Sequence, residues 1–140
     1  MNNIHPQLQK DCLLIGHFPL SRLLLNKDAN YPWFILVPDR ENISEIHQLT
    51  EADQQQLMRE SSYLSAILAE QFGADKMNVA AIGNIVSQLH IHHIVRYKDD
   101  IAWPSPVWGK YPSALYSADQ LERILLELKN LKLQNFEYEI

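Results

Sequence analysis

The sequence lacks the features that define several protein classes. It contains a single cysteine, Cys12, in 140 residues, so it can form no internal disulfide and has no Cys-x-x-Cys pair for zinc binding or redox chemistry. No apolar run approaches the roughly 18 residues of a membrane span. The amino-terminal sequence MNNIHPQLQKD lacks the basic region and apolar core that are typical of a secretory signal peptide. These absences favour a cytoplasmic protein with no membrane partner.

Positive charge is also scarce. The 12 Lys and Arg residues are outnumbered by 17 Asp and Glu residues, which gives a formal net charge of -5. The chain therefore has no overall basic character with which to bind a nucleic acid polymer. Anionic small molecules are still compatible with it, since local dipoles and one or two imidazoles can hold a phosphate. Apolar residues make up 46% and charged residues 21% of the chain, a globular balance, and the length predicts one domain, 1–140.

The order of the apolar segments predicts an α+β fold. Thr50 and Ser117 each precede a segment whose apolar residues recur every three or four positions, as in an amphipathic helix, and Gly73 ends the first of these helices. Five other apolar segments are expected to be strands. They are residues 12–18, 21–26, 33–38, 77–82 and 89–97. We expect an antiparallel sheet of about five strands, with one long inserted helix, a C-terminal helical extension at about 117–134, and the helices on one face.

Several other segments complete this prediction. Residues 5–10 are expected to form a short helical turn, and residues 27–28 and 99–100 are expected to form solvated turns. The strand 33–38, WFILVP, is apolar at every position, which indicates cover on both of its faces. The proline-rich loop after the last strand contains Trp103 and Trp108, which either form a lid or a base-stacking surface at a site, or act as hydrophobic staples that fix the loop.

Three of the six histidines lie within residues 87–96, SQLHIHHIVR. Because alternate side chains of a strand point to opposite faces, Gln88, His90 and His92 are predicted to form a polar row on one face. Such a row is costly in a core unless its nitrogens have partners, so the row indicates a functional site. His93 lies on the apolar face, where we expect a structural role, such as a neutral histidine hydrogen-bonded at a sheet–helix or subunit contact.

Two kinds of chemistry suit this row. A His-x-His pair can chelate a transition metal, but a metal site needs further ligands, and none lies at a recognisable spacing. Alternatively, a neutral imidazole, with a pKa of about 6.5, is a competent nucleophile at pH 7. It could attack the α-phosphate of a nucleotide while Gln88 and His92 hold the phosphate oxygens and assist the leaving group.

These residues resemble the signature of the histidine triad (HIT) superfamily, His-φ-His-φ-His-φ-φ, in which φ is apolar. The corresponding run here is QLHIHHI, residues 88–94. Upstream, LLLNKDANYPWFILVP resembles the two strands before the family's first long helix, and GNIVSQ resembles the turn that leads into the triad strand. The resemblance covers about residues 12–108.

The resemblance implies a homodimer, which the leucine-rich helical stripes also favour, and a nucleotidyl-histidine intermediate in nucleotide hydrolysis or transfer. His90 would be the nucleophile, and His92 would contact the phosphate or the leaving group. Asn26 would lie near the ribose, Asn84 would support the phosphate, and Trp108 resembles the tail that reaches a partner's site in some members. Substrates would be of the dinucleoside polyphosphate or nucleoside phosphoramidate type. No permanently bound cofactor and no metal site are expected, although Mg²⁺ can accompany a polyphosphate.

The sequence also departs from the signature. Gln88 occupies the first histidine position, Trp33 stands where many members have another histidine, and Ile85 replaces a hydroxyl residue that often binds phosphate. Glutamine can form hydrogen bonds but cannot titrate near pH 7. Two alternatives therefore stay open: a nucleotide-binding module with weakened catalysis, and a metal-binding protein that uses His90 and His92.

Overall fold

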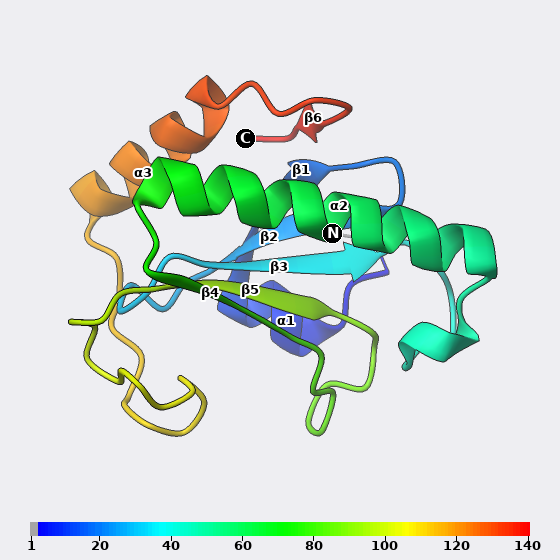
Figure 1. The fold of residues 1–140 in the computed structure, drawn as a ribbon, viewed down its shortest axis with the longest axis horizontal. Coiled ribbons are helices and arrows are strands. Elements are labelled where there is room, and N and C mark those ends of the chain that lie inside the picture. The colour runs from blue at the N-terminus through cyan, green and yellow to red at the C-terminus, as the bar shows by residue number, and fades with distance from the viewer. Residues whose placement is uncertain (1–2) are drawn as a thin grey trace.

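A six-stranded antiparallel sheet forms the centre of the protein (Figure 1). The computed structural model describes residues 3–140. In chain order the elements are α1 (Pro6–Asp11), β1 (Cys12–His17), β2 (Ser21–Asn26), β3 (Trp33–Pro38), the 3-10 turn η1 (Ile46–Gln48), α2 (Glu51–Phe72), β4 (Lys76–Ala80), β5 (Ile91–Arg96), α3 (Ala118–Asn130) and β6 (Glu137–Tyr138). The strands lie in the order β4-β5-β3-β2-β1-β6. The predicted α+β fold is confirmed, with one strand more than expected.

Both long helices begin where the sequence predicts. The Thr50 hydroxyl oxygen accepts a hydrogen bond of 3.1 Å from the backbone N–H of Asp53, which satisfies a free amide at the start of α2. At the start of α3, Ser117 and Gln120 each accept a hydrogen bond from the other's backbone N–H. Gly73 ends α2 with a positive φ of 59°, a conformation that glycine adopts without steric cost.

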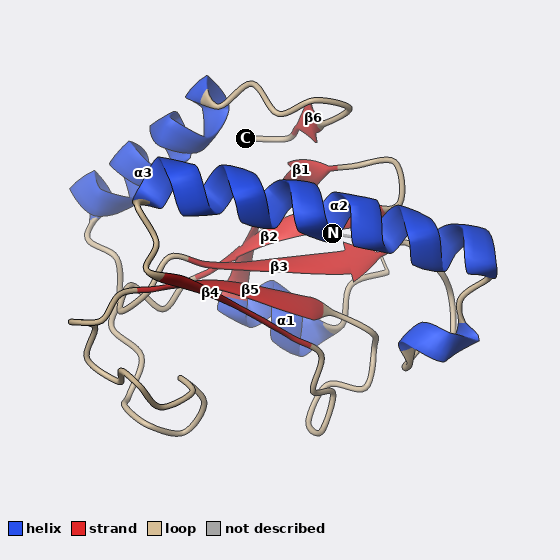
Figure 2. Ribbon diagram, in the orientation of Figure 1, coloured by secondary structure: helices blue, strands red, loops and turns tan. Residues whose placement is uncertain are grey.

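Helices cover both faces of the sheet (Figure 2), so the prediction of helices on one face is wrong. Helices α2 and α3 pack on one face, and α1 and the loop after β5 cover the other. The first face is held by an apolar cluster that includes Phe34, Leu64, Leu68, Val95, Ile124 and Leu128. The opposite cluster includes Leu8, Ile35, Val86, Ile94 and Val107. Strand β3 is buried at all six positions, which confirms the predicted cover on both sides.

The sixth strand was not predicted, because two residues are too short to show a periodic pattern. Strand β6 pairs with the end of β1, opposite Gly16 and His17. A Cβ atom at Gly16 would collide with the carbonyl oxygen of Glu137 and with the ring of Phe136. The absent side chain at residue 16 therefore permits the C-terminal strand to extend the sheet.

Strand β5 is shorter than predicted. It begins at Ile91, and Gln88 lies in a bend that precedes it. The strand lies between β3 and β4 and is buried at all six positions: His92 lies opposite Ile35 of β3 and Ala80 of β4. Alternate side chains of the strand therefore point to opposite faces of the sheet, with Ile94 in one apolar cluster and Val95 in the other.

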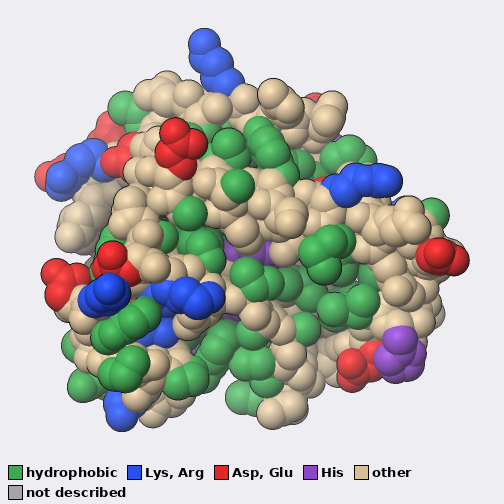
Figure 3. All heavy atoms as spheres, viewed as in Figure 1, with side chains coloured by type: hydrophobic (Ala, Val, Ile, Leu, Met, Phe, Trp, Pro, Cys, Tyr) green, Lys and Arg blue, Asp and Glu red, His purple; other side chains and the backbone are tan. Residues whose placement is uncertain are grey.

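On the face that carries α2, Lys and Arg side chains lie beside Asp and Glu. Figure 3 shows these charged side chains interspersed with hydrophobic ones. Among the described residues, none of the helices combines the length and the apolar composition that crossing a bilayer requires.

Candidate active site

One cavity brings together most of the residues predicted for the site. It has a volume of about 820 Å³, and we call it the histidine pocket. His90, His92, Asn26, Asn84 and Trp108 all line it. These residues come from β5 and the segment before it, the end of β2, the turn after β4 and the proline-rich loop, so the fold gathers segments that are far apart in the sequence.

Gln88 does not line the histidine pocket and lies outside β5, so the prediction that Gln88, His90 and His92 form one polar row along a strand is wrong. Its side chain turns towards the N-terminal segment. The carboxamide nitrogen donates a hydrogen bond of 2.6 Å to the carbonyl oxygen of Asn3, and the carboxamide oxygen accepts one of 2.8 Å from the backbone N–H of His5. The cause is the bend before β5, where the alternation of strand side chains does not apply.

The ring of His90 is held by a backbone carbonyl. Its Nδ1 atom lies 2.7 Å from the carbonyl oxygen of Gln88. Since a carbonyl oxygen can only accept, Nδ1 carries the proton of this hydrogen bond. When the ring is neutral, the lone pair is therefore on Nε2, and Nε2 is the atom through which His90 can act as a nucleophile.

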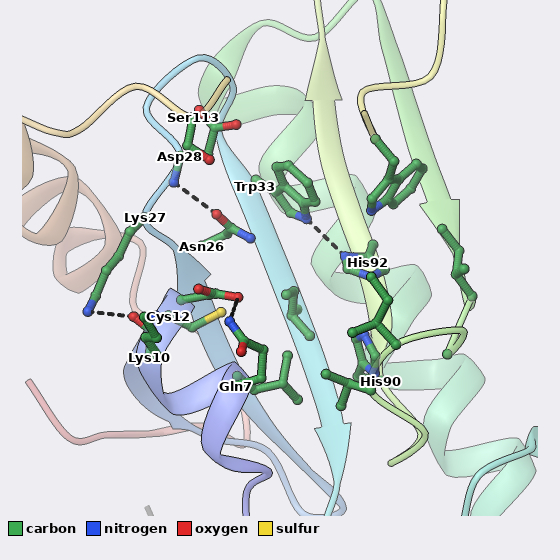
Figure 4. A pocket seen from close by; sticks show the side chains of 18 of the residues that line it. Gln7, Lys10, Cys12, Asn26, Lys27, Asp28, Trp33, His90, His92 and Ser113 are labelled. Carbon is green, nitrogen blue, oxygen red and sulfur yellow. Dashed lines mark hydrogen bonds between the residues drawn. The ribbon is translucent and has the colours of Figure 1, made fainter. Parts of the chain in front are cut away.

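The ring of His92 has the opposite tautomer. Its Nδ1 accepts a hydrogen bond of 3.0 Å from the indole N–H of Trp33 (Figure 4). The indole can only donate, so the proton of neutral His92 is on Nε2. Burial, together with the nearby His90 and His93, lowers the pKa of His92 to about 3. At neutral pH this side chain is an uncharged hydrogen-bond donor.

Several aromatic rings pack around His92. The rings of His90 and His92 meet edge to face, with centroids 4.9 Å apart. Trp108 packs edge to face against His92 at 5.0 Å and against Trp33 at 5.8 Å. Trp33 fixes the tautomer of His92 through its hydrogen bond. Trp108 packs against the rings of Trp33 and His92 and lines the pocket.

His93 points away from the pocket and is fully buried. Its Nε2 lies 2.7 Å from the hydroxyl of Ser61 on α2, and its Nδ1 lies 3.1 Å from the carbonyl oxygen of Ile91. Burial lowers the pKa of His93 to about 4, although the hydrogen bond to Ile91 acts to raise it. The predicted structural role of a neutral histidine at a sheet–helix contact is confirmed.

Acid should destabilise the protein through His93. The folded pKa of about 4 lies below the usual value of 6.5, so below pH 6.5 the unfolded chain binds more protons than the folded one. The stabilisation is complete above pH 6.5 and is lost as the pH falls towards 4, a change of about 3 kcal/mol. Urea unfolding between pH 4 and 7 measures it as the difference between the parent protein and a His93 variant, because His92, whose pKa is also lowered, adds to the pH dependence of both. His93→Gln should reduce this pH dependence, while the exposed-site control His47→Gln should keep it; equal slopes for all three proteins would contradict the assignment.

The turn after β2 is more ordered than the sequence suggests. The side-chain oxygen of Asn26 accepts a hydrogen bond of 2.8 Å from the backbone N–H of Asp28 (Figure 4). Asp28 is buried, and its carboxylate accepts from the backbone N–H groups of Asn30 and Ala114. The predicted solvated turn is thus wrong for Asp28, which ties the segment after the proline-rich loop to the edge of the pocket.

The wall formed by α1 was not predicted. Gln7, Leu8, Lys10 and Asp11 line the pocket from this helix, and Gln7 and Lys10 are labelled in Figure 4. Only tertiary packing places them there, and no motif in the sequence marks them. Cys12 also lines the pocket, but burial raises the pKa of its thiol to about 12, so the thiol is protonated at neutral pH.

A buried ion pair holds the proline-rich loop, so the predicted solvated turn is wrong for Asp100, whose side chain is 4% exposed. The guanidinium of Arg96 donates two hydrogen bonds to Asp100, of 2.8 and 3.1 Å, and a third of 2.9 Å to the carbonyl oxygen of Ser105. Arg96 is also stacked over the ring of Trp103. The two tryptophans therefore have different positions: Trp103 packs on Arg96 and fixes the loop, whereas Trp108 lines the pocket.

Within residues 3–140, no group of three or more His, Cys, Asp and Glu side chains is arranged to hold a metal ion. In that range His90 and His92 thus have no third ligand of these types, and the metal-binding alternative gains no support from the geometry.

The sheet, the paired histidines and the pocket define a histidine triad protein, and sequence comparison agrees. The HIT domain family model matches residues 7–99, and the chain belongs to this family. Family membership indicates nucleotide hydrolase or transferase chemistry. A comparison with curated protein sequences gave no significant match.

Solved structures of histidine triad proteins are similar over nearly the whole chain. One from Bradyrhizobium japonicum is 44% identical, with a TM-score of 0.90, and the match covers 94% of this chain and 98% of that one. One from Marinobacter aquaeolei VT8 is 48% identical, with a TM-score of 0.89 and coverages of 92% and 94%. The NitFhit protein of C. elegans, at 18% identity and a TM-score of 0.62, matches over 84% of this chain and 27% of that one and shares the fold alone.

Proposed function

We propose that the protein is a nucleotide hydrolase or nucleotidyl transferase that works through a nucleotidyl-histidine intermediate on His90. The observation that carries this proposal is the pair of fixed tautomers. The Gln88 carbonyl leaves the lone pair of His90 on Nε2, and the Trp33 indole leaves a proton on Nε2 of His92. A nucleophile and a hydrogen-bond donor thus lie side by side in one pocket.

The reaction has two displacement steps at phosphorus. In the first, Nε2 of His90 forms a bond to the α-phosphorus, and the bond from phosphorus to the leaving group breaks with its electron pair going to that group. The ring then carries a positive charge, which lies against the anionic phosphoryl oxygens. In the second, water (or another acceptor) attacks the same phosphorus, the P–N bond breaks, and the electron pair returns to Nε2. The proton of the attacking water passes to solvent.

His92 acts as a hydrogen-bond donor in this scheme. Because its pKa is about 3, the ring is neutral and holds an N–H that can stabilise charge on a phosphoryl oxygen or on the leaving atom. A polyphosphate leaves as an anion and needs no proton, and Mg²⁺ would arrive with such a substrate. An amine leaving group takes its proton from solvent, since neutral His92 is too weak an acid to supply one.

Three other pocket residues would hold the nucleotide. Asn26 would contact the ribose, with its side-chain nitrogen still available after the oxygen has accepted from Asp28. Asn84, exposed in the turn after β4, would support the phosphate. Trp108 would cover the phosphate side of the pocket, because it already packs against His92.

The experiment that tests this function is a trapping reaction. The protein is mixed with α-³²P-labelled dinucleoside polyphosphates and nucleoside phosphoramidates and quenched within milliseconds in alkaline denaturant, which preserves a P–N bond. Label recovered on the peptide that contains His90 is the expected result. Nucleotide binding by calorimetry without label or turnover would instead favour the binding-module alternative, and the absence of any binding would reject both.

We also propose that the protein forms a homodimer. The buried positions of α3, such as Ile124 and Leu128, pack within the protomer, so these leucine-rich stripes no longer argue for a dimer. The proposal is supported instead by β4, which is an edge strand with Val79 half exposed. Figure 1 shows β4 below α2. In the same view, Figure 3 shows a group of hydrophobic side chains below α2. Light scattering at micromolar concentration should give about twice 16.3 kDa, and Val79→Lys should shift the mass towards the monomer. A monomeric parent protein would contradict the proposal.

A further inference from the structure

The side chain of Gln88 links two distant parts of the chain. Its two hydrogen bonds join it to Asn3 and His5, which lie 85 and 83 residues away in the sequence. Both bonds are to backbone atoms, one to a carbonyl oxygen and one to an N–H two residues further on. A carboxamide presents its acceptor and one of its donors on the same edge, so it can pair with such a stretch of backbone.

A histidine could not make this pairing. The two ring nitrogens of imidazole point away from each other, so a ring that donates to the carbonyl of Asn3 cannot accept from the N–H of His5 at the same time. A glutamate would accept from His5, but its other oxygen would face a carbonyl. Glutamine at residue 88 therefore fits the N-terminal segment through its donor and its acceptor together.

The N-terminal segment in turn positions α1. The His5 side chain accepts a hydrogen bond of 3.0 Å from the backbone N–H of Gln7, and the carbonyl of His5 accepts one of 3.1 Å from Gln9. The other end of α1 is fixed by Lys27, whose backbone N–H and ammonium donate to the carbonyl oxygens of Asp11 and Lys10. The helix is thus held at both ends, and Gln88 supplies a side-chain attachment at its N-terminal side.

Gln88 also holds the nucleophile, by a different atom. Its carbonyl oxygen is the acceptor for Nδ1 of His90, while its carboxamide holds the segment that leads into the α1 wall. The same residue therefore contacts the reacting histidine through its backbone and the facing wall through its side chain.

We propose that Gln88 is a positioning residue that sets the distance between the α1 wall and His90, and so determines how the nucleoside part of the substrate fits the histidine pocket. This inference rests on the proposed nucleotide chemistry and adds a specificity role that lies outside the reacting groups. The side chain of Gln88 does not touch the substrate; it acts through residues 3–11.

Two variants separate this role from others. Gln88→Met keeps the length of the side chain and removes both hydrogen bonds, and Gln88→His installs the residue of the triad signature. The matched control is Gln55→Met, the same change at an exposed position of α2. Amide hydrogen exchange is measured for residues 3–11, and kcat and KM are measured for a nucleoside phosphoramidate and for a phosphoramidate that lacks the nucleoside.

Both variants should speed exchange in residues 3–11 and raise KM for the nucleoside substrate by about tenfold, with kcat changed by less than about twofold. The substrate without a nucleoside should show no such rise, and Gln55→Met should match the parent protein in every measurement. Unchanged exchange and unchanged KM would overturn the inference, and so would a fall in kcat at constant KM, which would mean that Gln88 acts in the chemistry.

The exchange measurement uses no nucleotide, so it separates the two proposals. A parent protein without nucleotide turnover would reject the proposed function, and faster exchange in the variants would still establish the attachment of α1. Turnover in the parent together with unchanged exchange in the variants would reject the positioning role alone.

Discussion

Replacing His90 with asparagine should lower kcat for nucleotide hydrolysis by about a thousandfold or more. Asparagine keeps an N–H that can donate to the Gln88 carbonyl, as Nδ1 of His90 does, but it has no basic nitrogen with which to attack phosphorus. Without the covalent route, only binding and the hydrogen bond from His92 remain. Steady-state kinetics under saturating substrate, together with the loss of trapped label, measure the effect.

The control for this prediction is a histidine outside the pocket. His47, exposed in η1, can be changed to asparagine in the same way and should leave kcat unchanged. Calorimetry should give an affinity of His90→Asn for a nucleoside monophosphate within a few fold of the parent. If His90→Asn turns over as fast as the parent, or still accumulates label on the protein, the nucleophile has been assigned incorrectly.

Replacing Asp100 with alanine should reduce the free energy of unfolding by about 3–5 kcal/mol, because it leaves a buried guanidinium without its counter-charge. Arg96 is only 1% exposed, and Asp100 accepts two of its hydrogen bonds. Asp100 also accepts from the backbone N–H groups of Tyr97, Ala102 and Trp103, so the loop loses several attachments at once. Urea unfolding at pH 7 measures the change.

The adjacent residue is the matched control. Asp99 is exposed, and Asp99→Ala should change the free energy of unfolding by less than about 0.5 kcal/mol. A loss below about 1 kcal/mol in Asp100→Ala would mean that solvent reaches Arg96 and that the pair is not buried as described. Because the same loop carries Trp108, Asp100→Ala should also weaken nucleotide binding at temperatures where the variant is still folded.

The fold could be predicted from the sequence where local patterns and tertiary packing agree. Thr50 and Ser117 mark helix starts because the chemistry of a cap is local to three or four residues. Strand β3 could be recognised because both of its faces are covered, which requires an unbroken apolar run. The cover supplied by α1 could not be predicted, since a six-residue helix shows too little periodicity to indicate which face it buries.

The site was predicted in part, and the errors have a common cause. His90 and His92 could be placed together because their spacing fixes their relative direction. The alternating pattern predicts Gln88 in the same row only if the strand extends to residue 88, but residue 88 lies in a bend and β5 begins at Ile91. The bond from Trp33 to His92 joins residues 59 positions apart, and no pattern within either strand could reveal it.

The complete burial of β5 has a consequence for how sequences with this fold can diversify. The strand carries His92 on one side and His93 on the other, so almost any replacement along it would disturb the packing of a layer as well as the chemistry. The segments at residues 82–86 and 113–115 also border the histidine pocket and lie in turns and loops. Selection for a new ligand should therefore change residues in these segments while the strand stays constant.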